Sequence, residues 1–296
     1  MWWIMQTLRE VIADAESKKR AIGHFNISDS EQLWAIFNAA RTVGVPVIVG
    51  VSEGERDFIG VRQAADLVRG LREEYDFPIF INADHTYSLD RVKEVIDAGY
   101  DAVIFDGNKV SHEENVTITK ACVAYARASG HEVLVEAELG NIGQSSKLLD
   151  AVPAGAALTE EMLTKPDELS AFVKETGVDL IAPAVGNLHG MLKHGKNPAI
   201  NIGLIKKLRE AGGVSMVLHG GSGITDKEFV DSIEAGIAIV HINTEIRVAY
   251  RKGIQLSLQE DPDEIAPYRF MKGGVQAVQE VVERRLRLFS GLQKAS

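Results

Sequence analysis

The sequence has almost no cysteine and no long apolar run, and these absences exclude several classes of protein. Its 296 residues include a single cysteine, Cys122, so no disulfide can form within the chain and a reducing compartment is expected. No stretch approaches the roughly 18 consecutive apolar residues of a membrane-spanning helix. The opening apolar residues soon give way to charged ones, without the apolar core of a secretory signal. We therefore expect a cytoplasmic protein.

The chain also lacks an excess of positive charge. It has 32 basic and 42 acidic residues, a formal net charge of −10. This balance argues against a nucleic acid or an anionic membrane as the main partner. An anionic small molecule would have to be bound by local groups. The sequence contains no low-complexity tract and no closely spaced HExxH or CxxC metal motif.

Short apolar runs alternate with helical periods along the chain. The runs favour buried parallel strands, each followed by a helix that covers the sheet. Eight such units in about 250 residues predict a TIM (β/α)8 barrel, here with a helical extension after Pro267, and we interpret residues 1–296 as one domain. A doubly wound open sheet is the alternative. The expected strands are 21–27, 45–52, 78–85, 102–107, 132–139, 180–186, 214–221 and 237–245.

Most of the unusual polar residues stand at the carboxyl ends of these expected strands. In a barrel these ends converge on the face that carries the active site. Three histidines from separate strands are therefore predicted neighbours, and three protein ligands with one open position are typical of catalytic zinc. The strand-end residues are Asp84, His85, Asp106, Glu136, Glu138, His189 and His219.

A structural interpretation competes with the metal hypothesis for each residue. A lone histidine at a strand end is more often a hydrogen-bonded structural residue than a ligand, and His24 lies within the first strand with no clear direction. Glu136 and Glu138 share one face of their strand at period two. Two buried carboxylates would repel, so we expect that one contacts a cation or points into solvent. The other histidines, His112, His131 and His194, are expected in solvent.

A second cluster suggests a phosphate site. The segment HGGSGIT, residues 219–225, joins a strand to a helix through glycines and offers backbone amides and the Ser222 hydroxyl at a helix start. Such turns often do no more than reverse the chain. Barrels, however, commonly bind phosphate after strands seven and eight. Further candidate ligands near this loop are Gly190, Lys193, Asn243 and Thr244.

Seven segments taken together resemble the class II, zinc-dependent fructose-bisphosphate and tagatose-bisphosphate aldolases. They are GHFNISD, PVIVGVSEG, NADHTYS, VEAELGNIG, AVGNLHG, VLHGGSG and INTE, and they span nearly the whole chain. The resemblance implies that Asp84 is the catalytic acid/base. It implies zinc on His85, His189 and His219, and a second or alternate metal position at Glu138 and Asp106, for a divalent or a monovalent cation. The implied substrate contacts are Asn26, Ser52, Gly190, Lys193, Gly220, Gly221, Ser222, His241, Asn243 and Thr244.

The implied activity is reversible cleavage of a ketose 1,6-bisphosphate, fructose 1,6-bisphosphate in the first place, to dihydroxyacetone phosphate and glyceraldehyde 3-phosphate, by a homodimer or homotetramer. Tagatose bisphosphate, which differs at C4, is the alternative substrate. A zinc hydrolase or a non-catalytic phosphate-ligand binder on the same barrel are alternatives of other classes. A Schiff-base aldolase would need a lysine at a strand end, and the nearest is Lys109, beyond the fourth strand.

The chain departs from the family pattern at two places. After the fifth strand, Gln144 and Ser145 stand where acidic residues are common, so Glu160 or Glu161 becomes the candidate lid acid within the irregular stretch 140–162. In the eighth strand His241 stands where the family usually has asparagine. We expect His241 to donate to a substrate oxygen.

Overall fold

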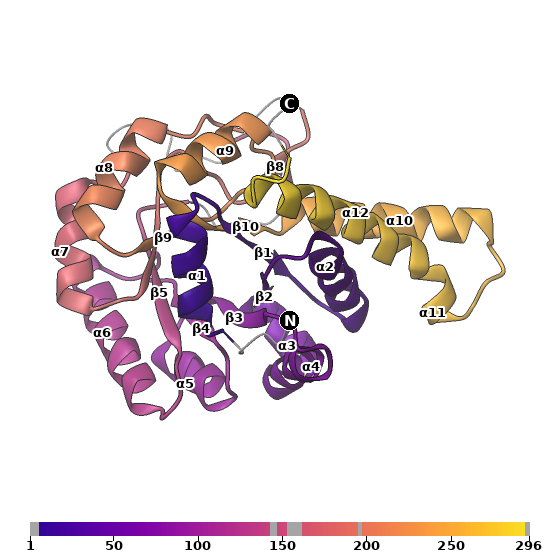
Figure 1. Cartoon of the computed structure of the whole chain (residues 1–296), viewed down its shortest axis with the longest axis horizontal. Helices are drawn as coiled ribbons and strands as arrows, with labels where there is room; N and C mark the ends of the chain where they lie inside the picture. The colour runs from indigo at the N-terminus through magenta and orange to yellow at the C-terminus, as the bar shows by residue number, and fades with distance from the viewer. Residues whose placement is uncertain (1–5, 143–146, 153–161, 195–196, 294–296) are drawn as a thin grey trace.

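The computed structural model describes residues 6–142, 147–152, 162–194 and 197–293. Eight parallel strands close into a barrel in the order β1-β10-β9-β7-β5-β4-β3-β2 (Figure 1). Closure confirms the TIM barrel and excludes the open sheet, and each predicted strand segment matches one strand, the third ending one residue later than predicted. The strands are β1 Ile22–Asn26, β2 Val47–Val51, β3 Ile79–Thr86, β4 Ala102–Phe105, β5 Leu134–Leu139, β7 Leu180–Pro183, β9 Ser215–Leu218 and β10 Ile237–Ile242.

Helices cover the outside of the barrel, and local signals fix their ends. α2 begins where the Asp29 carboxylate accepts from Gln32 N at 2.8 Å, and it ends at Gly44, which adopts the left-handed conformation. Cys122 is buried on α6. The helices that follow strands are α2 Ser30–Val43, α3 Glu53–Ile59, α4 Val61–Tyr75, α5 Leu89–Asp97, α6 His112–Ala128, α7 Pro166–Thr176, α8 Ile202–Gly212, α9 Asp226–Ala235 and α10 Thr244–Glu260.

A helix that the sequence analysis did not predict, α1 Leu8–Ser17, closes the amino end of the barrel. Its apolar side carries Leu8, Val11, Ile12 and Ala15, which pack on the first inward-facing residues of the strands. Burying such side chains contributes about 1.5–3 kcal/mol each. The amino end is therefore filled with apolar side chains.

The barrel interior changes from apolar to polar along each of three strands. Successive side chains of a strand alternate between the two faces of the sheet, so every second residue points inward. The first inward residue of each strand belongs to the apolar cluster under α1, and the next two are buried polar residues. These inward series are Ile22, His24 and Asn26 on β1, Phe80, Asn82 and Asp84 on β3, and Leu134, Glu136 and Glu138 on β5.

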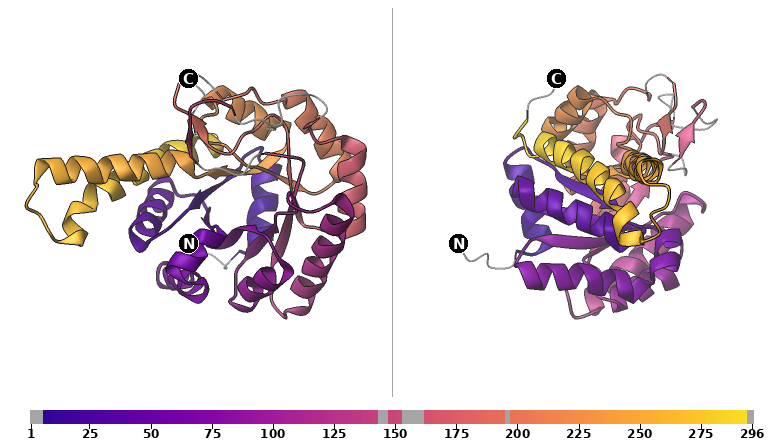
Figure 2. Two further views of the ribbon diagram at one scale, coloured as in Figure 1. Left: turned by 180° about the vertical axis from the view of Figure 1, so that it is seen from behind. Right: turned by 90° about the vertical axis from the view of Figure 1, so that its right-hand side faces the viewer.

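The expected helical extension after Pro267 is present as α11 Pro267–Phe270 and α12 Lys272–Phe289. α10 and α12 pack along each other and project from one side of the barrel (Figures 1 and 2). Ile265 and Tyr268, close to α11, are 89% and 68% exposed. Above the barrel mouth, β6 Leu148–Leu149 pairs with β8 Met191–Leu192. Within the described ranges, no helix is both long and apolar enough to cross a membrane.

Candidate active site

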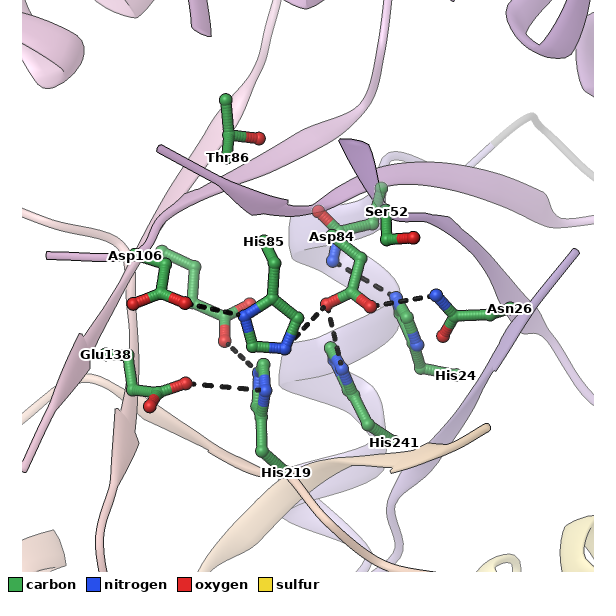
Figure 3. Close-up of polar contacts among 12 residues, drawn as sticks. His24, Asn26, Ser52, Asp84, His85, Thr86, Asp106, Glu138, His219 and His241 are labelled. Carbon is green, nitrogen blue, oxygen red and sulfur yellow. Dashed lines mark hydrogen bonds and ion pairs between the residues drawn. The ribbon is translucent and has the colours of Figure 1, made fainter. Parts of the chain in front are cut away.

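Four side chains from separate strands and loops meet at the carboxyl end of the barrel. His85, Glu138, His189 and His219 each offer one ligand atom, and these atoms all lie within 4.8 Å of one another. Figure 3 shows His85, Glu138 and His219 pointing toward one another. The three histidines predicted as neighbours therefore share one site, together with one of the two predicted carboxylates.

A bulge in β3 explains how the adjacent residues Asp84 and His85 both reach this site. Between two paired positions β3 advances three residues, from Ala83 to Thr86, while β4 advances only two, from Val103 to Phe105. The extra residue leaves the ladder and changes the direction of its side chain. His85 also has a φ of 45°, in the left-handed region that few non-glycine residues adopt. Asp84 faces inward by strand alternation, and the bulge turns His85 inward beside it.

Two of the histidines each contact a buried carboxylate through the ring nitrogen that faces away from the cluster. Asp106 lies 2.9 Å from His85 Nδ1, so Nε2 of that ring faces the site. Glu136 lies 2.9 Å from His219 Nε2, which leaves Nδ1 to face Glu138. Such carboxylate–histidine pairs orient metal ligands and fix their tautomers. Both Glu136 and Glu138 are buried, so of the two alternatives the one that places a carboxylate in solvent is wrong, and Glu136 contacts the imidazole of His219.

The electrostatics of the cluster fit a bound cation. Burial opposes charge on His85, but the carboxylates of Asp84 and Asp106 raise its pKa to about 10. Burial and the neighbouring Asp106 raise the pKa of Glu138 to about 8. Glu138 Oε2 and His219 Nδ1 are buried and have no hydrogen-bond partner among the described residues. Surroundings that favour positive charge on His85 also favour a cation at its Nε2, and such a cation would satisfy both orphaned atoms.

Asp84 lies beside this cluster as an ionised carboxylate. Burial alone would raise its pKa, but His85, His241 and His24 lower that pKa well below the ordinary value. Asn26 Nδ2 donates to Asp84 Oδ2 at 2.8 Å, so the other oxygen faces the site. Asp84 Oδ1 lies 3.8 Å from His85 Nε2 and 3.6 Å from His241 Nδ1 (Figure 3). One oxygen is therefore fixed and the other is placed to take a proton.

Two stacked imidazoles lie next to Asp84. The rings of His24 and His241 are parallel, with centroids 3.4 Å apart, and burial lowers the pKa of both, that of His24 to about 4. The His24 ring fits only beside a glycine, because a Cβ on Gly50 would lie 2.1 Å from His24 Cε1. His24, whose direction the sequence left open, therefore belongs to the site.

The predicted phosphate loop lies against the same cluster. Gly220 has a φ of 62°, and a Cβ there would lie 2.4 Å from the Leu188 carbonyl oxygen, so the close approach requires glycine. Ser222 is buried and its hydroxyl accepts from Glu245 N, in the first turn of α10. One small cavity is lined by both the cluster and this loop; its lining includes Asn26, Asp84, His189, Gly190, Gly221, Asn243 and Thr244.

A larger cavity of about 490 Å³ opens from the cluster toward solvent. It is lined by Ser52, Tyr87 and Arg247, among other residues, and it shares Asp84 and His85 with the inner site. Arg247 also forms an ion pair with Glu55, which accepts from Asn26 Nδ2. Arg247 was not among the predicted site residues, since a charged residue on a helix resembles a solvated surface residue in sequence. Glu55 carried a signal, because Ser52 and Glu55 form an S-x-x-E capping box.

Other predicted residues lie elsewhere or outside the described ranges. Lys193 Nζ forms an ion pair with Asp150 at 2.8 Å, beside the β6–β8 pair, and its role in binding phosphate stays a prediction. Asp106 contacts His85 from behind, and its role as a second metal ligand also stays a prediction. Gln144, Ser145, Glu160 and Glu161 lie outside the described residues.

Comparisons with known proteins agree with this geometry. The family model described as "Fructose-bisphosphate aldolase class-II" matches residues 6–294. The chain is 35% identical over 293 residues to a fructose-bisphosphate aldolase of Geobacillus stearothermophilus, and 33% identical over 292 residues to one of Staphylococcus epidermidis; each match covers 98% of both chains. Its structure is similar to that of the YdjI aldolase of Escherichia coli K12, with a TM-score of 0.80, 28% identity and 98% of both chains covered.

Proposed function

The chain belongs to the class-II fructose-bisphosphate aldolase family, and from this premise we propose that it cleaves fructose 1,6-bisphosphate reversibly to dihydroxyacetone phosphate and glyceraldehyde 3-phosphate. The observation that carries the proposal is the position of Asp84 Oδ1, 3.8 Å from a nitrogen of the histidine cluster and next to the phosphate loop. A base beside a cation site and a phosphate site is what cleavage of a phosphorylated ketose requires.

We propose zinc as the metal of this metal-dependent family in the present chain. His85, His189 and His219 would hold it, with Glu138 as a further or alternate ligand, and the orphaned buried atoms of His219 and Glu138 support the assignment. When bound, zinc supplies a Lewis acid that polarises the ketose carbonyl, a contribution of several kcal/mol. Imidazole and carboxylate ligands are those that zinc uses in catalytic sites.

Asp84 acts on the other side of the breaking bond. As the C3–C4 bond breaks, its electron pair moves onto C3, and the C4 hydroxyl becomes an aldehyde by giving its proton to Asp84 Oδ1. Asn26 keeps the second carboxylate oxygen in place during this transfer. General base help of this kind contributes about 10²- to 10⁴-fold. The group that protonates C3 stays a prediction, with His241, Glu160 and Glu161 as candidates.

The two phosphates of the substrate have separate candidate sites. The loop of Gly220, Gly221 and Ser222, with Asn243 and Thr244 at the start of α10, fits the phosphate on the ketone side. Ser52 and Arg247 line the outer cavity and fit the phosphate on the aldehyde side. Arginine binds phosphate through a fork of N–H donors, and Glu55 pre-orients that fork here. This division accounts for phosphate binding by a chain of net negative charge.

Assembly, domain organisation and location are further parts of the proposal. The exposed Ile265 and Tyr268 on the arm of α10, α11 and α12 support a homodimer or homotetramer, because exposed apolar side chains on a projecting element favour contact with a second copy. The family match over residues 6–294 supports a single domain. A cytoplasmic location fits an enzyme that uses a phosphorylated sugar.

A coupled assay of both C4 epimers, with and without chelator, tests the proposal. We expect fructose 1,6-bisphosphate to be cleaved faster than tagatose 1,6-bisphosphate, activity to disappear after exhaustive chelation, and added zinc to restore it. Borohydride with substrate should trap no adduct on Lys147, which also lines the outer cavity. Full activity after chelation would contradict the metal assignment. Faster cleavage of the tagatose epimer would reassign the substrate.

A further inference from the structure

One buried arginine contacts the β3 bulge on both sides of His85. Arg56, on α3, is 0% exposed, and its guanidinium reaches across to β3. Nη1 donates to the carbonyl oxygen of Asp84 at 3.1 Å, and Nη2 donates to Thr86 Oγ1 at 3.0 Å. Nη1 also donates to the carbonyl oxygen of Val51, at the end of β2. The guanidinium therefore links the neighbouring strand to the residues that flank His85.

Two of these bonds go to Asp84 and Thr86, the residues on either side of His85 in the stretch that the bulge removes from regular pairing with β4. Because Asp84 and His85 have no paired position on β4 within this shift, the pairing between strands does not fix them. The Thr86 hydroxyl, which accepts from Arg56, also donates to the Ala83 carbonyl oxygen at 3.5 Å. Arg56 and Thr86 thus enclose the residues between Ala83 and Thr86, where His85 adopts its left-handed φ of 45°. Conformations of this kind are energetically costly and persist only when their surroundings impose them.

Burying the Arg56 guanidinium costs free energy of folding, so stability alone does not explain its position. Among the described residues no carboxylate forms an ion pair with its guanidinium, and Nε is buried without a partner. Burial lowers the pKa of Arg56, as it does for a charge held away from water. A buried charge that is bonded only to neutral oxygens contributes less to the free energy of folding than an apolar side chain of the same volume would. Its geometric effect is different, since a planar fork can hold several oxygens at once.

We infer that Arg56 is a positioning residue of the active site: by holding the Asp84 carbonyl and the Thr86 hydroxyl, it sets the directions of the Asp84 carboxylate and the His85 imidazole. The inference rests on the proposed function, because it assigns Asp84 and His85 their roles there. Arg56 is not among the described residues that line the two cavities of the site, nor among those of the metal cluster. Its effect reaches the site through the backbone of two adjacent residues, so one substitution disturbs both the base and a metal ligand.

The test compares Arg56→Met with Arg56→Lys in the full chain. Methionine fills the space without donors, and lysine keeps the charge but cannot hold three oxygens in one plane. For Arg56→Met we expect zinc affinity, measured by competition with a chromogenic chelator, to fall about 10- to 100-fold, as for other groups that orient ligands. We also expect the visible spectrum of the cobalt-substituted protein to shift, because it reports ligand geometry. kcat should fall about 100-fold with little change in KM. Arg56→Lys should recover part of each loss.

Arg72→Met is the matched control, since Arg72 holds the opposite end of the same strand. Its Nε donates to the Ile79 carbonyl oxygen at 2.7 Å, and it pairs with Asp101, which accepts from Ile81 N. This variant should lose stability but keep the cobalt spectrum, zinc affinity and kcat of the parent.

The outcomes are separable. If Arg56→Met folds and matches Arg72→Met in every readout, Arg56 is structural and the inference fails. If Arg56→Met does not fold, Arg56→Lys decides by the same measurements, and parental spectrum, affinity and kcat in it overturn the inference. If the parent itself cleaves neither ketose bisphosphate, the proposed function fails, whereas an active parent with unaffected variants refutes only the role of Arg56.

Discussion

At its amino end the barrel is closed by the apolar side of α1, whereas at its carboxyl end it is closed by histidines and carboxylates. Ile12 of α1 packs in one apolar cluster with Ile22 and Phe80 of the strands, and Asp179 nearby is paired with Arg9 and Arg127. At the other end, Asp84 Oδ1 and His219 Nδ1 are buried, and no residue in the described part of the chain forms a hydrogen bond with either atom. Both ends are made from the same eight strands, a few residues apart.

The difference shows how this fold separates stability from chemistry. Apolar packing at the amino end contributes free energy of folding and leaves no group to react. Buried polar atoms without partners at the carboxyl end cost free energy of folding and become satisfied only when a ligand arrives. We therefore expect substitutions at the carboxyl end to change activity first, and substitutions at the amino end to change stability first.

The largest expected effect is that of His219→Ala. Removing a ligand that Glu136 orients should abolish stoichiometric zinc binding, and cleavage of fructose 1,6-bisphosphate should fall to background. Zinc content by elemental analysis and a coupled assay check this, with circular dichroism to verify folding. An active, folded His219→Ala protein would remove His219 from the metal site.

Asp84→Ala should have the next largest effect. Loss of the base should lower kcat about 10²- to 10⁴-fold, with a smaller change in KM, because the carboxylate acts mainly in the transition state. Zinc content should stay at the parental level, since Asp84 lies beside the proposed ligands and is not one of them. A kcat near that of the parent would exclude Asp84 as the base.

Ile12→Ala tests the amino end. The side chain is buried in the cluster under α1, so its truncation should lower the free energy of unfolding by about 2–5 kcal/mol. kcat of the folded fraction should stay at the parental value. Urea unfolding and steady-state kinetics measure the two quantities on one preparation. A fall in kcat without loss of stability would show that the two ends are not independent.

Asp179→Asn should have the smallest effect and a characteristic pH dependence. Burial alone would raise the pKa of Asp179, but hydrogen bonds from Arg127, Val135 N and Arg9 lower it below the ordinary value. A carboxylate whose pKa is lower in the folded than in the unfolded state stabilises the folded protein at pH values above the unfolded-state pKa. This contribution to the free energy of unfolding is lost as the pH falls through the folded-state pKa. Near pH 7 the variant should be less stable by about 1–3 kcal/mol.

The unfolding free energies of Asp179→Asn and the parent should converge below about pH 4, where the aspartate becomes protonated. Urea unfolding at several pH values measures this convergence. A difference that stays constant with pH would mean that the charge of Asp179 does not contribute.

The barrel could be predicted because its signals are local. Each strand appears in the sequence as a short apolar run followed by a helical period, and polar residues such as Asp84 and His189 stand where those runs end. α1 was missed because its four apolar positions become informative only when the open end of the barrel is known. The sequence cannot show which end of a closed sheet needs covering.

The sequence predicted most of the residues that form the site, but it predicted less of how their side chains are oriented. The metal cluster follows from residues at strand ends, but the inward turn of His85 depends on a bulge. Arg56, which donates to the residues on both sides of His85, resembles a solvated helix residue in sequence. Arg247 and His24 were missed or left open for a similar reason. Their roles come from residues far away in the chain, Glu55 and His241, which no local pattern connects to them.

The contact between Gly50 and His24 limits the order in which substitutions can accumulate in this protein. A side chain at position 50 would overlap the His24 ring and lie 3.0 Å from Asn26 Oδ1, so it is acceptable only after His24 has become smaller. A smaller residue 24 removes the ring on which His241 stacks. The three positions therefore form an epistatic unit, in which Gly50→Ala is harmful in the parent and tolerated only after residue 24 has changed. Directed evolution of this active site would reach a new residue 50 through position 24 first.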